Sequence, residues 1–411
     1  MNKAQLINYA VKNNAYYKDL FALNNLSIIK EDLFDKIPTS DKKSFQRYGD
    51  MLSLPYQSYP LSENIVTINS SGSTGECLKI YWDKKDRVFS LLTSWKWRKK
   101  HFGISPSDKF IDFYTTHYIN NRFVEDMPDI LEIGKHHTSF SKLNLTPEKL
   151  DKYIDYLYCF QPVWINVTPS ILTLLTMRLE ERELKFPATM KYIELNGEYI
   201  SKESVAYFSK RYGVYIANFY GCNEVNYIAC ECECGNMHVL EENVFLEILK
   251  DGKTAPKGEQ GDIVVSGLHN KAMPAIRYKP GDEGMLDSVT RCPCGEKSPI
   301  LTLSEIRNKY VIKTRNSSFS STEIIYLIER VNSLLNHCIL QYQAIQRETD
   351  EIEMHVVLKK DYETWKDTVK ETFEQNIVNE ELKEIEWNFY FEDAIYPAPT
   401  TGKLSYFIGM M

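Results

Sequence analysis

The chain has 411 residues, a length that excludes a single small module and allows one large domain with a second, smaller one. Its 49 basic and 56 acidic residues give a net charge of −7, and no cluster of lysine and arginine resembles a nucleic-acid-binding arm, so we expect no nucleic-acid partner. The N-terminal run MNKAQLINYAVKNN has no signal-peptide pattern, and no apolar run is long enough to span a membrane. We therefore expect a soluble, cytoplasmic protein without a membrane partner.

The first 60 residues have the pattern of helices and turns, and a strand, a polar loop and a second strand follow. The strand-like runs ENIVTIN and LKIYWD flank the loop. Its glycines let the backbone approach a ligand closely and its hydroxyls add donors, a combination that suits a polyphosphate. It is not a Walker loop, because Glu76 follows the second glycine, and an ordinary polar hairpin tip is the alternative. The predicted phosphate-binding residues are Ser70, Ser71, Gly72, Ser73, Thr74 and Gly75.

Strands alternate with helices from about residue 160. PVWINV and MKYIELN read as strands, and the helix between them has Thr168 as its N-cap. Ser201 caps the next helix, which ends at Gly213 before the apolar run VYIANFYG. This alternation predicts a parallel sheet whose ligands gather beyond the carboxyl ends of its strands, and YGCNE (220–224) lies at such an end.

The pattern changes after Ile306. A helix (SSTEIIYLIERVNSLL), two strands (HCILQYQAIQ and EIEMHVVLK), a helix (DYETWKDTVKETFEQNI) and a strand (EIEWNFYF) follow. Such a compact α+β unit of about one hundred residues is within the usual size of a domain. We predict an α/β protein with a large N-terminal domain of mixed and parallel sheets (1–305) and a small α+β C-terminal domain (306–411).

Five of the nine cysteines crowd into two short runs, CECEC (230–234) and CPC (292–294). In a reducing compartment this spacing predicts metal ligation rather than disulfides. Free buried thiols are the alternative to metal ligation, and this alternative is open for Cys77, Cys159, Cys222 and Cys338.

Six motifs follow one another along the chain. They are SSGSTG (70–75), NGE (196–198), YGCNE (220–224), RYKPGDEG (277–284), the arginine of IRNKYVI (306–312) and PTTGKL (399–404). Together with NNAYYKDLF and FDKIPTSDKKSFQRY near the N-terminus, they resemble the adenylate-forming superfamily of acyl- and aryl-CoA ligases, most closely its phenylacetate-CoA ligase branch. The resemblance spans essentially the whole chain, and six motifs in the expected order are far more specific than one.

The resemblance implies how ATP is bound. The hydroxyl-rich loop holds the β- and γ-phosphates while a substrate carboxylate attacks the α-phosphate, which yields an acyl-adenylate and pyrophosphate. Glu224 corresponds to the glutamate that holds Mg²⁺, and Asp282 to the aspartate that accepts both ribose hydroxyls. The other implied nucleotide-binding residues are Gly197 and Glu198 at the adenine face, Tyr220 and Gly221 beside it, and Asn223 where a threonine is usual.

Two C-terminal positions complete the implied site. Arg307 corresponds to the arginine at the domain junction that reaches ribose and phosphate, and Lys403 to the lysine that binds the attacking carboxylate and the α-phosphate. The dipeptide Lys-Tyr at 309–310 replaces an acidic pair that is usual there. Arg277 is expected to support its turn rather than to touch a ligand. The predicted catalytic residues are therefore Lys403, Glu224 and Arg307.

The resemblance also implies a zinc site. Sequences of this branch often carry Cys and His after the YGxTE-like motif and a CxCG run later, to which ECECGNMHV and RCPCG correspond. Four protein ligands leave no open position, so the implied Zn²⁺ is structural. The implied ligands are Cys232, His238, Cys292 and Cys294, with Cys234 as a substitute and Cys230 spare.

The resemblance therefore implies an AMP-forming acid-thiol ligase that uses ATP and Mg²⁺ and transfers an acyl or aryl group to CoA. A carrier-protein thiol or an amine as acceptor stays open, as do the identity of the acid and a homodimeric assembly. His117 and its aromatic neighbours either line the acid pocket or belong to the core. A non-catalytic zinc-bearing homologue is disfavoured, because all the implied charged residues are present.

Overall fold

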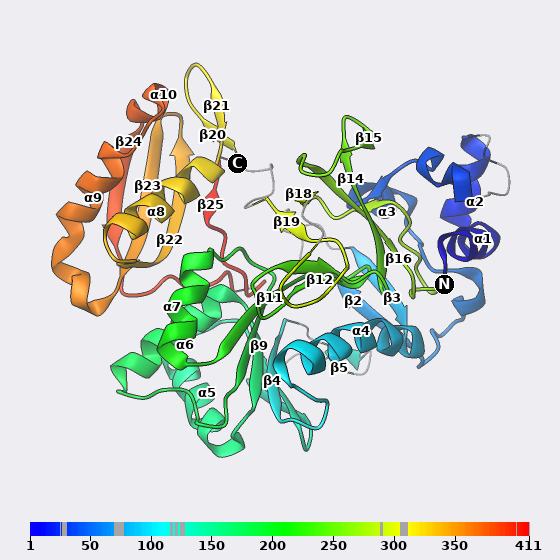
Figure 1. Cartoon of the computed structure of the whole chain (residues 1–411), viewed down its shortest axis with the longest axis horizontal. Coiled ribbons are helices and arrows are strands. Elements are labelled where there is room, and N and C mark those ends of the chain that lie inside the picture. The colour runs from blue at the N-terminus through cyan, green and yellow to red at the C-terminus, as the bar shows by residue number, and fades with distance from the viewer. Residues whose placement is uncertain are drawn as a thin grey trace. The chain divides into compact units, whose positions relative to one another are not determined.

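The structure is a computed structural model that divides into two compact units, described here in turn (Figure 1). The first comprises Met1–Asp108, Thr116–Met127 and Ala217–Ser304, and the second comprises Lys109–Thr115, Pro128–Ile216 and Glu305–Met411. The C-terminal residues group with the central segment, and the predicted division into 1–305 and 306–411 stays a prediction. The structure describes all residues except 25, 27–30, 70–77, 116–117, 120–121, 124–127, 288–290, 305–310, 400 and 411, and gives the backbone alone at 31–33, 69, 118–119 and 122–123.

The first unit contains a seven-stranded sheet with the strand order β1-β17-β16-β14-β15, in which β18 also pairs with β16 and β19 pairs with β18. Its strands are β1 (Ser40–Asp41), β14 (Val244–Lys250), β15 (Lys253–Thr254), β16 (Gly261–Gly267), β17 (Tyr278–Lys279), β18 (Glu283–Leu286) and β19 (Leu301–Leu303). The antiparallel strands β11, β12 and β13 span Tyr215–Cys222, Asn226–Glu231 and Met237–Val239. The remaining strands are β2 (Ile65–Asn69), β3 (Lys79–Asp83), β5 (Tyr118–Ile119) and β6 (Arg122–Phe123).

Helices of the first unit include α1 (Lys3–Asn13), α2 (Ala15–Leu23), α3 (Lys42–Tyr48) and α4 (Lys84–Phe102), with 3-10 turns η1 (Glu31–Lys36) and η2 (Leu54–Tyr56). The longest of these, α4, begins where the Asp83 side chain accepts hydrogen bonds from two backbone N–H groups and ends at Gly103, whose left-handed conformation suits glycine. The strands β2 and β3 pair antiparallel, so the predicted strand-loop-strand arrangement is confirmed, while the loop itself lies outside the described residues.

The second unit holds a parallel sheet in the order β10-β9-β4-β8, with β7 antiparallel to β8. The predicted parallel sheet is therefore confirmed. Its strands are β4 (Phe110–Tyr114), β7 (Ile130–Gly134), β8 (His137–Ser141), β9 (Trp164–Val167) and β10 (Tyr192–Asn196), and its helices are α5 (Pro147–Phe160), α6 (Pro169–Glu181) and α7 (Lys202–Tyr212).

The C-terminal part of the second unit is an α+β layer with the strand order β24-β23-β22-β25 (Figure 1). Buried side chains from α8, α9 and all four of these strands form its core. The elements are β20 (Val311–Lys313), β21 (Ser318–Ser320), α8 (Thr322–Leu334), β22 (Ile339–Glu348), β23 (Glu351–Leu358), η3 (Lys360–Trp365), α9 (Lys366–Gln375), α10 (Glu380–Lys383), β24 (Glu386–Phe391) and β25 (Phe407–Ile408).

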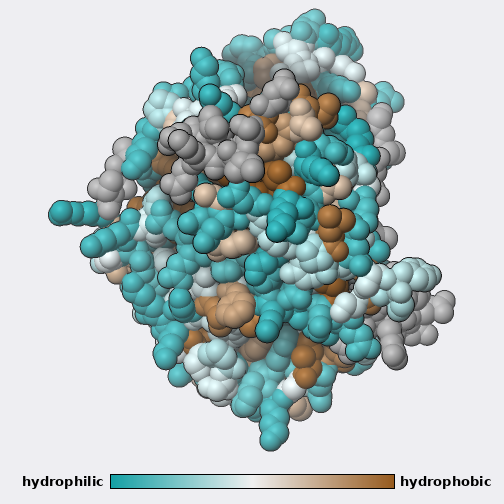
Figure 2. Space-filling view, turned by 90° about the vertical axis from the view of Figure 1, so that its right-hand side faces the viewer, coloured by the Kyte–Doolittle hydropathy of each residue, from teal (hydrophilic) through white to brown (hydrophobic). Residues whose placement is uncertain are grey.

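Hydrophilic side chains predominate on the face shown in Figure 2, and hydrophobic ones lie between them in small separate patches. Within the described part of the chain, no helix combines the length and the apolar character needed to cross a bilayer.

Candidate functional site

Tyr220 and Asp282 of the first unit are joined by a hydrogen bond. The Tyr220 hydroxyl donates to Oδ2 of Asp282 over 2.9 Å. Tyr220 belongs to β11, and Asp282 directly precedes β18. The bond fixes a carboxylate beside an aromatic ring, and this pair offers an acceptor for hydroxyl groups next to a stacking surface.

The turn that follows Tyr220 is built on a glycine. The pairing of β11 with β12 shifts register between Tyr220 and Gly221, and a Cβ at position 221 would collide with the carbonyl oxygen of Asn226. The indole N–H of Trp82 donates to the carbonyl oxygen of Asn223 over 2.8 Å. Gly221 and Asn223 are both exposed, so this turn is held in place while its outer side stays open to solvent.

Glu224 is 6% exposed and its carboxylate is oriented by a tyrosine. The Tyr278 hydroxyl donates to Oε1 of Glu224 over 2.8 Å. Burial, and then the charge of Glu224, raise the pKa of Tyr278, so the phenol keeps its proton and remains a donor. A single oriented carboxylate is the kind of protein ligand that Mg²⁺ takes when phosphate oxygens and water supply the rest of its shell.

Arg277 is a structural residue, as expected. Its guanidinium is paired with Glu247 at 3.2 Å and donates to the carbonyl oxygens of Asp35 and Ile37 at 2.6 Å each. Both side chains of the ion pair are 5% exposed, so the pair lies inside the first unit.

Four of the predicted metal ligands come together in the first unit. The ligand atoms of Cys232, His238, Cys292 and Cys294 all lie within 4.8 Å of one another. The cysteines lie on two Cys-x-Cys-Gly turns, in which the fourth-residue glycine N–H donates to the carbonyl oxygen of the first cysteine at 2.9 and 3.0 Å. Cys234, the predicted substitute ligand, is exposed and lies outside this group.

The surroundings of these four residues fit a bound cation. The Nδ1 atom of His238 lies 3.2 Å from the carbonyl oxygen of Ser298, which leaves Nε2 to face the thiols, and Nε2 is 3.5 Å from Sγ of Cys294. Burial raises the pKa of the Cys292 thiol, but hydrogen bonds from the Cys294 backbone and from Asn236 outweigh it and lower the pKa to about 6. A thiolate among further sulfur and nitrogen donors is the donor set of a closed zinc site.

His101, at the C-terminal end of α4, bridges the two cysteine turns. Its Nδ1 lies 2.5 Å from Oε2 of Glu233, and its Nε2 lies 3.1 Å from Oε1 of Glu296. Glu233 belongs to the first turn and Glu296 follows the second, and the imidazole is 2% exposed. Each ring nitrogen therefore faces a carboxylate, and the imidazole links the two turns through its polar contacts. No local motif marks this bridge, because His101 lies more than one hundred residues from either glutamate.

In the second unit, Glu198 connects the start of α6 with the C-terminal loop. Its carboxylate accepts from the N–H of Ser170 at 3.0 Å, from the Ser170 hydroxyl at 2.9 Å and from the N–H of Leu404 at 2.9 Å. Thr168 occupies the N-cap position of α6, but its side chain makes no capping bond. Glu198 satisfies the helix N-terminus instead, where a negative charge is favoured. Gly197 precedes it with φ of +78°, a conformation that favours glycine.

The loop that carries Lys403 packs closely against Lys142 through Gly402. Gly402 has φ of +59°, and a Cβ at this position would lie 2.5 Å from Cγ of Lys142 and 2.9 Å from its carbonyl oxygen. Position 402, directly before Lys403, therefore accommodates only glycine, because any larger residue would collide with Lys142. Leu404 packs with Ile395 and Val357 in a small buried cluster next to Met177 of α6. Hydrogen bonds, a close backbone contact and apolar packing thus place Lys403 in the second unit.

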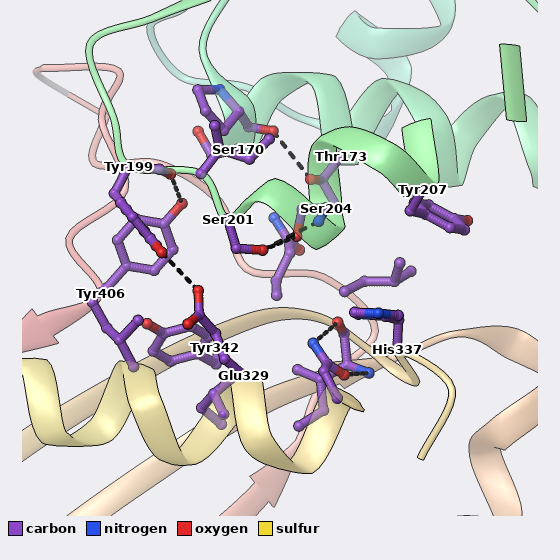
Figure 3. Close-up of a pocket in the computed structure, with 18 of the residues that line it drawn as sticks. Ser170, Thr173, Tyr199, Ser201, Ser204, Tyr207, Glu329, His337, Tyr342 and Tyr406 are labelled. Carbon is purple, nitrogen blue, oxygen red and sulfur yellow. Dashed lines mark hydrogen bonds between the residues drawn. The ribbon is translucent and has the colours of Figure 1, made fainter. Parts of the chain in front are cut away.

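A cavity of about 90 Å³ lies next to this loop, between α6 and α7 on one side and α8 and β22 on the other (Figure 3). Its hydroxyl groups mostly bond to other residues of the wall, since Tyr199 donates to Glu329 at 2.6 Å and Tyr406 donates to the carbonyl oxygen of Tyr199 at 3.2 Å. The cavity is smaller than typical small-molecule sites.

Several predicted site residues lie outside the described residues. These are the phosphate-binding loop from Ser70 to Gly75, Arg307 with the dipeptide at 309–310, and His117. The predicted residues that are described fall into two sets, one in each unit. The set in the first unit is Tyr220, Gly221, Asn223, Glu224 and Asp282, and that in the second is Gly197, Glu198 and Lys403.

The chain has the fold of the adenylate-forming enzymes. It is similar to 2-hydroxyisobutyryl-CoA ligase in the postadenylation state in complex with R3-HIB-AMP, with a TM-score of 0.74 and 15% identity over 99% of this chain and 87% of that one. The anthranilate CoA ligase AuaEII in complex with anthranoyl-AMP has a TM-score of 0.56 and 16% identity, over 84% of this chain and 66% of that one. The amide bond synthetase McbA from Marinactinospora thermotolerans has a TM-score of 0.52 and 14% identity, over 84% and 69%.

No protein-family model matches the sequence, and no curated protein matches it significantly. The adenylate-forming fold predicted from the motifs is confirmed, while the phenylacetate-CoA ligase branch stays a prediction.

Proposed function

We propose that this protein activates a carboxylic acid as its acyl-adenylate. A carboxylate oxygen of the acid bonds to the α-phosphorus of ATP, the bond from that phosphorus to the bridging oxygen breaks, and pyrophosphate leaves with the electron pair. The observation that carries the proposal is the fold, which is shared over 99% of the chain with a CoA ligase bound to R3-HIB-AMP. The order of the six motifs along the chain agrees with it.

Each residue in this proposal has a role that its chemistry suits. Asp282, oriented by Tyr220, accepts the ribose hydroxyls, and Glu224, oriented by Tyr278, is the protein ligand for Mg²⁺. The bound ion neutralises charge on the phosphate oxygens. Lys403 contacts the charge that develops at the α-phosphate, where a positioned cation contributes more in the transition state than in the ground state.

The remaining nucleotide-binding assignments rest on the resemblance alone, and the zinc site also rests on the grouping of its four ligands. The loop from Ser70 to Gly75 holds the β- and γ-phosphates, Arg307 contacts ribose and phosphate, and the backbones of Gly197 and Gly221 approach the adenine. Cys232, His238, Cys292 and Cys294 hold a Zn²⁺ ion with no open coordination position, so the metal stabilises the fold and takes no part in the chemistry.

In the second half of the proposed reaction the acyl group moves to the thiol of CoA. The sulfur attacks the acyl carbonyl carbon, the thiol proton is lost, and AMP leaves with the oxygen that joined it to the acyl group. The similarity to two CoA ligases supports this acceptor. An amine is the second candidate, because an amide bond synthetase shares the fold, and a carrier-protein thiol is a third.

The test of adenylation is acid-dependent exchange of labelled pyrophosphate into ATP, measured with a panel of aryl, acyl and amino acids. We expect exchange with one class of acid only, and Lys403→Ala should reduce the rate roughly 10²- to 10³-fold. The matched control is Lys383→Ala, which removes a surface lysine of α10 and should leave exchange unchanged. Competition between CoA and amines for the preformed acyl-adenylate then identifies the acceptor.

Two results would contradict the proposal. Exchange that needs no acid would show that the chain does not form an acyl-adenylate. Hydrolysis of ATP to ADP, with no AMP, would show that the bond broken lies between the β- and γ-phosphates.

A further inference from the structure

Lys142 is a second lysine beside the loop that carries Lys403. It directly follows β8, at the carboxyl end of a parallel strand, and its N–H donates to the carbonyl oxygen of Tyr114 at the corresponding end of β4. Its Cγ, Cδ and carbonyl oxygen occupy the space in which a side chain of Gly402 would lie. Lys142 is therefore fixed at the sheet edge where parallel sheets bind ligands, in direct contact with the neighbour of Lys403.

The charged groups that face Lys142 are Lys403 on the C-terminal loop and Glu198 on the turn after β10. Glu198 already accepts three hydrogen bonds, from Ser170 and Leu404. Within the described part of the chain, no hydrogen bond or ion pair joins the Lys142 ammonium group to another residue. This region thus brings the Lys142 amine close to Lys403, and its carboxylate, Glu198, already accepts three hydrogen bonds.

We propose that Lys142 and Lys403 together bind the anionic junction between carboxylate and α-phosphate in the acyl-adenylate, which makes Lys142 a substrate-binding lysine. This inference rests on the proposed adenylation.

The electrostatics support this arrangement. Two neighbouring ammonium groups repel each other in a partly buried site, and an anion between them removes the repulsion and gains two charge-assisted bonds. Burial, and then the charge of Lys403, lower the pKa of the Lys142 amine to about 8, whereas Glu198 acts in the opposite direction. An anion that binds beside this partly buried amine stabilises its protonated form.

The experiment compares the binding of AMP with that of adenosine by calorimetry on the full-length protein. The two probes differ by the phosphate alone, so the ratio of their affinities isolates the anion contact. Lys142→Met keeps most of the aliphatic stem beneath Gly402 and removes the charge. We expect it to weaken AMP binding roughly ten- to hundredfold, the effect of losing one hydrogen bond to a charged group, and to leave adenosine binding unchanged.

Two further variants serve as controls. Lys142→Arg keeps the cation and should restore most of the AMP preference. Lys152→Met removes an exposed lysine of α5 in the same unit and should leave both affinities as in the wild type.

The pH dependence gives an independent readout. The phosphate of AMP is doubly charged above about pH 7, while unliganded Lys142 loses its proton as the pH rises through about 8. The preference of the wild type for AMP over adenosine should therefore fall between pH 7.5 and 9.5, and that of Lys142→Met should stay constant over this range.

The outcomes separate the two proposals. A wild type that binds AMP more tightly than adenosine, with the same preference in Lys142→Met, overturns the role of Lys142 and leaves the proposed function intact. Equal weakening of AMP and adenosine in Lys142→Met shows a structural role and also overturns the inference. A wild type that binds neither probe overturns the proposed function and this inference with it.

Discussion

Replacing Gly402 with alanine tests whether Lys403 acts from the position seen in the second unit. The new Cβ would lie 2.5 Å from Cγ of Lys142 and 2.9 Å from its carbonyl oxygen, and the carbonyl cannot move aside as a side chain can. Overpacking of this kind costs about 1 to 3 kcal/mol, in addition to about 1 to 2 kcal/mol for φ of +59° in an L-residue. The collision occurs only while the loop contacts Lys142. We therefore expect the loop of the variant to detach from Lys142, because detachment relieves the collision.

Gly213→Ala is the matched control for this variant. Gly213 has φ of +65° at the end of α7, but a Cβ there would meet no atom within 4 Å. Both variants carry similar backbone strain, so only the collision distinguishes them. We expect pyrophosphate exchange to fall roughly ten- to hundredfold in Gly402→Ala and to stay within about twofold of the wild type in Gly213→Ala.

Hydrogen exchange provides a readout that does not depend on the reaction. The Leu404 N–H is protected by Glu198 in the docked loop, and it should exchange faster in Gly402→Ala than in Gly213→Ala. Wild-type protection of this amide together with wild-type pyrophosphate exchange in Gly402→Ala would refute the reasoning.

Two further predictions concern the first unit. Arg277→Met leaves Glu247 buried without its partner and should lower the free energy of unfolding by about 3 to 5 kcal/mol in urea titrations, while adding Glu247→Leu should recover most of the loss. A loss below about 1 kcal/mol in the single variant would contradict this. Protein prepared without added metal should contain about one zinc per chain by elemental analysis, and Cys292→Ser should lose it while Cys234→Ser keeps it, since Cys234 lies outside the cluster. Equal metal content in the two variants would argue against the four-residue site.

Local signals allowed much of the fold to be predicted. Ser201 and Gly213 delimit α7 as expected, because a hydroxyl cap and a left-handed glycine act within a few residues of the helix they end. The helix expected over DYETWKDTVKETFEQNI is shorter, and its first part is the 3-10 turn η3. The N-cap residue of α9, Trp365, makes no capping hydrogen bond with its side chain, so the sequence has little to mark that boundary.

In the candidate site, local signals predict some residues but not the contacts between distant parts of the chain. The grouping of four metal-binding side chains was predictable, because the crowding of the cysteines indicated metal ligation and the family resemblance implied the four residues. The partners of Glu198 were not, since Leu404 lies 206 residues away and the bond depends on how the C-terminal loop docks. Lys142 has no motif around it, and its importance follows only from its contact with Gly402.

The two cysteine turns lie 60 residues apart along the chain, and a bound metal would close that segment into a loop. By the chain-entropy argument used for disulfides, closing a loop of this length restricts the unfolded ensemble by about 4 kcal/mol. The enclosed segment contains the buried ion pair of Arg277 with Glu247, Tyr278, which orients Glu224, and Asp282 itself. Loss of the metal would remove that restriction, and it would act on the proposed nucleotide site from outside it, through the chain segment that carries Tyr278 and Asp282.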